Sequence, residues 1–220
     1  MFRFSSRIVP IVIVALVATV RPALAGPPLL CHPFDIAGAP SLPWDGTANN
    51  WSKEASDYNR QNLIRDTRAL LTPSTPVIVR METLRRAALY ASHDERMATQ
   101  LLAALTERAK AAERAGASDA AMALFDAGYL VETFKQIGQL GQSPEFRTRA
   151  KAMAAVAASA EGYALVRQSI SLRPDDPGLQ FAAALINADR DRAAYQQHAS
   201  KARKGAAQDA LVAKNLHHIS

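Results

Sequence analysis

The chain of 220 residues carries 26 Lys and Arg against 20 Asp and Glu, a formal net charge of +6. The basic residues are spread along the chain and form no concentrated stripe, which argues against nucleic acid as a partner. The length suffices for one domain, or two small ones, with a hydrophobic core. Cys31 is the only cysteine, so a disulfide within the chain is excluded.

Residues 1–25 have the pattern of a secretory signal peptide. Arg3 and Arg7 precede an apolar run over residues 8–20, and a small-x-small triplet ends at Ala25. A basic start, a short apolar run and such a triplet are typical of a cleaved signal. The run is shorter than the roughly 18 apolar residues that identify a membrane span. We expect cleavage after Ala25 and a periplasmic or extracellular mature protein without a transmembrane segment.

Residues 26–50 form a proline-rich segment, here called the arm. Its five prolines each fix φ and remove a backbone donor, which excludes a long helix. The arm also carries many apolar side chains: Leu29, Leu30, Phe34, Ile36, Leu42 and Trp44. A secreted monomer does not leave such a surface in water. We therefore expect an extended arm packed over the helical domain, with a partner-binding arm as the alternative.

Cys31 lies in this arm, and its state stays open between three forms. A free, buried thiol is the preferred interpretation, because free cysteine packs as a small hydrophobic residue. Acylation is disfavoured, since Leu29 and Leu30 stand where bacterial lipoproteins carry a small residue before the cysteine. A disulfide to a second chain is the third form.

Residues 51–220 are predicted to form a series of helices with short connections. Apolar residues recur at helical spacing between capping residues, glycines and prolines. The predicted helices cover residues 51–71, 76–91, 95–115, 118–137, 145–156, 163–172, 179–188, 190–204 and 206–216. Residues 118–137 are apolar nearly all round, which predicts a central helix buried on more than one side. No stretch of this region alternates like a half-buried strand, so the predicted fold class is all-α with antiparallel helix pairs.

Residues 163–177 resemble the second helix and linker of a tetratricopeptide repeat, a helix pair of about 34 residues. Leu172 stands two residues before Pro174, as a leucine does in that family. Counting back places the start of the unit at Ser143, and a second unit follows from Pro177. The resemblance covers residues 143–204. It implies a short solenoid, against an irregular bundle as the alternative, and the binding of a protein or peptide.

The match within the first unit is partial. Phe146, Ala150 and Met153 stand at the family's aromatic, small and tyrosine positions, whereas Arg149 replaces a preferred leucine.

Motifs for catalysis, phosphate or metal binding are absent from the sequence. The five histidines lack a His-Glu-x-x-His spacing, and neither a glycine-rich phosphate loop nor Gly-x-Ser-x-Gly occurs. We therefore expect no metal and no other cofactor. His217 and His218 are interpreted as part of a frayed tail.

The predicted helix 118–137 carries the candidate partner-binding residues. Steps of about 100° per residue place one set of polar side chains within roughly a third of its circumference. The set comprises Asp126, Tyr129, Glu132, Thr133 and Gln136. A solvated outer face is the preferred interpretation, and a groove-lining patch for a basic or hydrogen-bonding ligand is the functional one. Gly128 beside this face allows another element to approach closely.

The predicted helix 76–91 adds Arg80 to the candidates. Arg80 and Arg85 flank its apolar stripe, which suits anion capture, although arginine stems that cover core edges are commoner. Glu82 and Arg86 are spaced for a surface ion pair.

Three functions follow as hypotheses. The first is a secreted or periplasmic, non-enzymatic helical-repeat protein that binds a protein or peptide. The second is a hydrolase of envelope material with Asp126 and Glu132 as acid and base, although their positions lie about 9 Å apart along the helix axis. The third is a purely structural envelope component.

Overall fold

The computed structural model describes residues 26–220, and the predicted signal peptide lies outside this range. Within residues 26–220 the regular structure is helical, without a strand, and the predicted all-α class is confirmed. The α-helices of this range are α1 (Leu63–Leu70), α2 (Val77–Ala91), α3 (Glu95–Arg114), α4 (Ala120–Gln139), α5 (Arg147–Ala157), α6 (Gly162–Leu172), α7 (Pro177–Asn187), α8 (Arg192–Gly205) and α9 (Ala210–Asn215).

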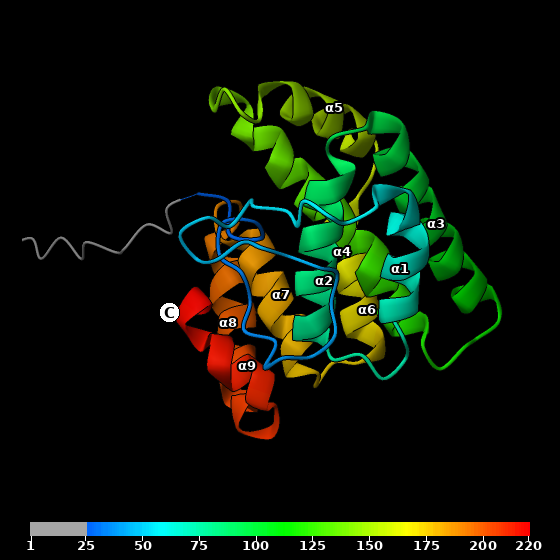
Figure 1. Ribbon diagram of the computed structural model, residues 1–220. Coiled ribbons are helices and arrows are strands. Elements are labelled where there is room, and N and C mark those ends of the chain that lie inside the picture. The colour runs from blue at the N-terminus through cyan, green and yellow to red at the C-terminus, as the bar shows by residue number, and fades with distance from the viewer. Residues whose placement is uncertain (1–25) are drawn as a thin grey trace, which may run out of the picture.

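Helix α4 forms the centre of the domain (Figure 1). It packs against α2, α3, α5 and α6, and nearly all of its side chains are buried. A helix that is apolar around most of its circumference has to be covered on several sides. The prediction of a central helix is therefore confirmed.

Helices α7 and α8 form a hairpin beside this centre. Helix α7 also packs on α2 and α6, and the short C-terminal 3-10 turn, Leu216–Ile219, packs on α7. Helices α5 and α6, which carry the tetratricopeptide resemblance, pack more extensively on α4 than on each other. The solenoid arrangement stays a prediction.

Aspartates begin several of the helices. Asp94, Asp176, Asp191 and Asp209 each accept hydrogen bonds from two amides in the first turn of α3, α7, α8 and α9. These bonds satisfy donors that the helix backbone itself leaves unpaired.

The first predicted helix begins much later than expected. Helix α1 starts at Leu63, and a short 3-10 turn at 60–62 precedes it, so the prediction of a helix from residue 51 was wrong. Tertiary contacts hold the earlier residues: the Trp51 ring stacks on Phe146 at 5.5 Å between centroids. The Ala55 amide donates to the Tyr90 hydroxyl at 3.1 Å. Such contacts outweigh the helical pattern of residues 51–62.

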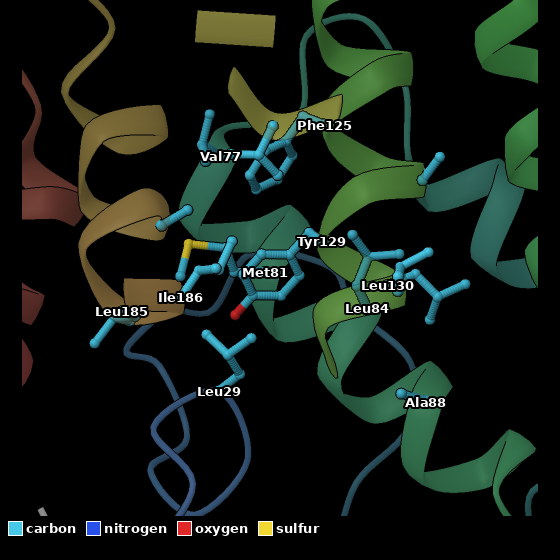
Figure 2. Close-up of a cluster of buried hydrophobic side chains, with 14 of the residues drawn as sticks. Leu29, Val77, Met81, Leu84, Ala88, Phe125, Tyr129, Leu130, Leu185 and Ile186 are labelled. Carbon is cyan, nitrogen blue, oxygen red and sulfur yellow. The ribbon is translucent and has the colours of Figure 1, made fainter. Parts of the chain in front are cut away.

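The arm has no α-helix and contributes side chains to the core. Leu29, Leu30, Phe34 and Leu42 are at most 4% exposed. Leu29 lies in one hydrophobic cluster with side chains of α2, α4 and α7 (Figure 2). The arm therefore contributes several of its apolar side chains to the core, whereas Asp35, Ala37, Gly38 and Pro40 between them stay exposed.

Candidate functional site

All six predicted partner-binding residues are buried in the structure. Gln136 is 9% exposed, and Arg80, Asp126, Tyr129, Glu132 and Thr133 are 3% exposed or less. The preferred expectation of a solvated outer face is therefore wrong. The polar side of α4 is covered because α2, α3, α6 and the arm all reach it.

Arg80 and Asp126 form a buried ion pair between α2 and α4. Arg80 Nη1 lies 2.6 Å from Asp126 Oδ2, and these side chains are 0% and 1% exposed. Arg80 also donates to the carbonyl oxygens of Thr72 and Thr75. The prediction that arginine stems cover a core edge was wrong for Arg80, because its guanidinium is buried as well. The anion that Arg80 binds is an aspartate of its own chain.

Arg108 on α3 extends this pair. Its Nη1 lies 3.4 Å from Asp126 Oδ2, and its Nη2 donates to Asp119 at 3.2 Å. Burial raises the pKa of Asp126 to about 6, against the attraction of Arg80 and Arg108. The two guanidiniums favour the ionised carboxylate, with which both can pair.

Glu132 connects α4 to the start of α6 and to the α7–α8 turn. Its carboxylate accepts from Arg190 at 2.7 Å, from Lys135 at 3.0 Å and from the Tyr163 amide at 3.0 Å. The Tyr163 amide belongs to the first turn of α6, where a negative charge is stabilising. Glu132 therefore acts as a cap for a neighbouring helix.

Of the other three candidates on α4, Gln136 and Thr133 have partners within the chain, and Tyr129 has none for its hydroxyl. Gln136 Oε1 accepts from the Leu29 amide of the arm at 2.8 Å. The Thr133 hydroxyl donates to the Tyr129 carbonyl at 2.8 Å. The Tyr129 hydroxyl is buried without a hydrogen-bond partner, and burial raises its pKa. The six residues thus belong to separate contacts and do not form one site.

A second buried cluster, Glu82, Arg85 and Arg86 on α2, was not recognised as such from the sequence. Glu82 accepts from Arg85 and Arg86, each with a bond of 2.7 Å to Oε1. The predicted ion pair between Glu82 and Arg86 forms, but its expected place on the surface is wrong, since Glu82 is fully buried. Arg85 is fully buried as well. Burial by itself would raise the pKa of Glu82, but the two guanidiniums outweigh it and hold the pKa below its usual value.

This cluster holds the backbone of the arm. Glu82 accepts from the Phe34 amide at 3.1 Å. Arg85 donates to the Leu30 carbonyl at 3.3 Å, and Arg86 donates to the Leu42 carbonyl at 2.6 Å. The amides and carbonyls of the extended arm are not paired within a helix. Side chains of α2 therefore serve as their hydrogen-bond partners. The arm and α2 are tens of residues apart, and no local sequence signal predicts this contact.

A third cluster, Glu54, His93 and Arg149, lies nearer the surface. His93 Nε2 is 2.8 Å from Glu54 Oε1, and Arg149 Nη1 is 3.0 Å from His93 Nε2. Arg149 was noted in the sequence only as a departure from the repeat pattern. The departure has a structural reason, because Arg149 joins α5 to the α2–α3 turn and to residue 54.

A hollow of about 700 Å³ lies where α3 and α6 end and α4 begins. It is lined by Pro73, Glu113, Gly116, Ala117, Ser118, Asp119, Ala120, Ala121, Met122, Gln168, Leu172 and Arg173. Small apolar residues form much of its wall, and Glu113, Asp119 and Arg173 supply charge. Leu172 at this hollow is 55% exposed, and no other large hydrophobic side chain in residues 26–220 is exposed.

The first turn of α4 contributes polar groups to this hollow. Asp119 precedes α4, but its side chain makes no capping bond and binds Arg108 instead. The amides in the first turn of a helix lack backbone partners, and the helix dipole favours a negative group there. The hollow therefore combines an apolar wall with the N-terminal end of α4.

Two further findings concern metals and membranes. Among residues 26–220, no three His, Cys, Asp or Glu side chains are placed to hold a metal ion together. In the same range, no helix combines the length and the hydropathy that crossing a membrane requires.

No protein-family model matches the chain, and neither a curated protein nor a solved structure is found to be similar to it.

Proposed function

We propose that the protein is a secreted, non-enzymatic helical protein that binds a protein or peptide partner in the hollow between α3, α4 and α6. The observation that carries this proposal is Leu172, a large apolar side chain exposed at the edge of a hollow with an apolar wall. Exposed apolar surface next to a concavity is a feature of interaction sites.

The hollow favours a particular chemistry in the partner. Its volume of about 700 Å³ falls within the usual range for ligand sites and admits one or two apolar side chains. The first turn of α4 and Arg173 suit a backbone carbonyl or a carboxylate next to those side chains. We therefore propose an apolar side chain of the partner as the group that contacts Leu172.

Secretion is supported by the pattern of residues 1–25, and peptide binding by the tetratricopeptide resemblance of residues 143–204. The hydrolase alternative is disfavoured by the surroundings of its two carboxylates. Asp126 and Glu132 have side chains 1% and 4% exposed, and both are paired with arginines of the same chain. A substrate would have to displace these arginines to reach either group.

Site-specific cross-linking in the native host tests the proposal. A photoreactive amino acid replaces Leu172 in the full-length protein, and the matched control carries it at Gln100, an exposed position on α3 away from the hollow. We expect a defined cross-linked partner from position 172 only. Leu172→Asp should then abolish co-purification of that partner, whereas Gln100→Asp should retain it.

Two outcomes contradict the proposal. One is the absence of a specific product at position 172 in a protein whose circular dichroism is native. The other is the same set of products from both positions, which would favour a structural component without a binding site in the hollow.

A further inference from the structure

Three histidines gather where the arm meets the C-terminus. His32 belongs to the arm, whereas His217 and His218 belong to the C-terminal turn. The centroids of the His32 and His218 rings are 5.9 Å apart, and those of His217 and His218 are 4.0 Å apart. The fold thus brings both ends of the described chain together through imidazole rings.

The C-terminal turn is packed, so the expectation of a frayed tail was wrong. His218 is 7% exposed and Ile219 is fully buried. The His218 ring makes edge contacts with Phe34 of the arm at 5.3 Å and with Phe181 of α7 at 6.5 Å. Arg203 of α8 donates to the Ile219 carbonyl. The arm, α7 and α8 therefore all contribute to the surroundings of His218.

These surroundings offer little to stabilise a proton on the rings. Glu82 of α2 is the carboxylate that acts on His218, and it already accepts from Arg85 and Arg86. His32 Nε2 is buried without a hydrogen-bond partner.

The remaining charged and titratable groups around the cluster come from several elements. They are Cys31 and Asp35 of the arm, Arg203 of α8, which donates to the Ile219 carbonyl, and Lys214 of α9, whose carbonyl oxygen lies 3.2 Å from His217 Nδ1. Asp35 lies 3.8 Å from Lys214, so a cation already occupies its neighbourhood. Helix α7 contributes no charged side chain, since its sequence contains none.

The electrostatics favour neutral rings of His32 and His218 while the arm is docked. Burial, together with the neighbouring His217 and His32, lowers the pKa of His218 to about 4, and Glu82 opposes this only in part. Burial, with His217, also lowers the pKa of His32. The ordinary pKa of histidine is about 6.5.

We propose that this histidine cluster is a pH-sensitive latch, which favours docking of residues 29–35 against the C-terminal turn while its rings are neutral and shifts the equilibrium towards their opening when the rings are protonated. The inference goes beyond the proposed partner binding, because it makes exposure of the arm depend on acidity.

Proton linkage determines how docking of the arm depends on pH. When the arm is released, His32 of the arm and His218 of the C-terminal turn regain an ordinary pKa, so the released state binds more protons than the docked state. The latch is therefore at full strength above about pH 6.5 and weakens as the pH falls towards 4. Each pH unit in this window changes the equilibrium by about tenfold per group, so His218 alone favours release by more than about tenfold at pH 4.5.

Cys31 provides the readout, because it is the only thiol, is buried and precedes His32. The experiment measures how fast 4,4′-dithiodipyridine, which reacts with thiols in acid, labels Cys31 in the mature chain between pH 7.5 and 4.5. Rates are divided by those of the same chain in denaturant, and helicity is followed by circular dichroism. We expect normalised labelling to rise by at least tenfold at pH 4.5 while helicity is retained.

Two variants separate the latch from general acid instability. His218→Phe keeps an aromatic ring among Phe34 and Phe181, and it should remove most of the rise. His198→Gln is the matched control: His198 on α8 contacts Tyr163 and Gln180, and burial lowers its pKa too. This control should keep the full rise. If His218→Phe does not fold, His32→Phe replaces it, with the same expected loss of pH dependence.

The latch is refuted if labelling stays constant down to pH 4.5 or rises only together with a loss of helicity. It is equally refuted if the folded variant at position 218 or 32 retains the full rise.

Discussion

Arg80, Arg85 and Asp126 place charges inside the core, where an unpaired charge costs several kcal/mol. Each is accommodated by hydrogen bonds from the surrounding chain. Arg80 binds Asp126 and two backbone carbonyls, and Arg85 binds Glu82 and backbone carbonyls of Leu30 and Trp51. At the residue scale, Arg80 and Asp126, which were predicted to bind a partner, therefore stabilise the fold through contacts within the chain.

Asp126→Ala tests this role. The change leaves Arg80 buried without its carboxylate, and we expect a loss of about 3–5 kcal/mol in the free energy of unfolding. Urea denaturation followed by circular dichroism measures it. The matched control, Glu107→Gln on α3, removes an exposed carboxylate paired with Lys110 and should leave the midpoint unchanged. Equal midpoints for the two variants would contradict a structural role for Asp126.

At the element scale, α4 and α6 approach each other closely at Gly128 and Gly162. A Cβ atom at Gly128 would lie 2.6 Å from the Gly162 carbonyl oxygen, and one at Gly162 would lie 2.6 Å from the Gly128 carbonyl oxygen. The predicted close approach at Gly128 is confirmed, and α6 is the element that makes it. Because backbone atoms are involved, no rotamer change can relieve a side chain there.

Gly128→Ala should destabilise the protein although alanine favours helix. The gain in helix propensity is about 1 kcal/mol, whereas overpacking against a backbone costs about 1–3 kcal/mol and here belongs to the upper part of that range. We expect a net loss of about 1–2 kcal/mol in thermal or urea denaturation. At Gly141 a Cβ would meet only Ala150 at 3.7 Å, so Gly141→Ala serves as control and should change stability little. A Gly128→Ala variant that is more stable than the unchanged protein would contradict this prediction, because α4 and α6 could then move apart at little cost.

At the scale of the whole molecule, the arm covers part of the core, although it precedes the helices and has no helix of its own. Leu29, Leu30, Phe34 and Leu42 are buried, and fully burying each such side chain contributes about 1.5–3 kcal/mol. Side chains of α2, α4 and α9 hold the backbone of the arm. Asn215 of α9 accepts a hydrogen bond from the Asp35 amide and donates one to the Asp35 carbonyl.

Deletion of residues 26–45 should therefore lower the melting temperature and increase the binding of a hydrophobic dye. The expected loss is several kcal/mol, since four buried side chains and their hydrogen bonds are removed. Differential scanning calorimetry and dye fluorescence measure the two effects. Thr47→Ala, an exposed change just after the deleted segment, is the control. If the deletion leaves both quantities unchanged, the arm is free for a partner and does not support the core.

The sequence by itself determined the class of the fold and the position of most helices. Periodic apolar residues and local helix-end signals act within a few turns, so they are visible in the chain. The continuous apolar surface of α4 likewise predicted its central place. Residues 51–62 show the limit, because their helical pattern is overridden by contacts of Trp51 and Ala55 with distant side chains.

Only the tertiary structure decided which polar residues are buried and what they contact. Arg80 and Asp126 are 46 residues apart, Leu29 and Gln136 are 107 apart, and Asp35 and Asn215 are 180 apart. Helical spacing places side chains on one face of a helix, but it does not say whether water or another helix covers that face. The hollow at Leu172 and the histidine cluster also combine elements that are distant in sequence. Their existence depends on how the helices pack, which no local pattern encodes.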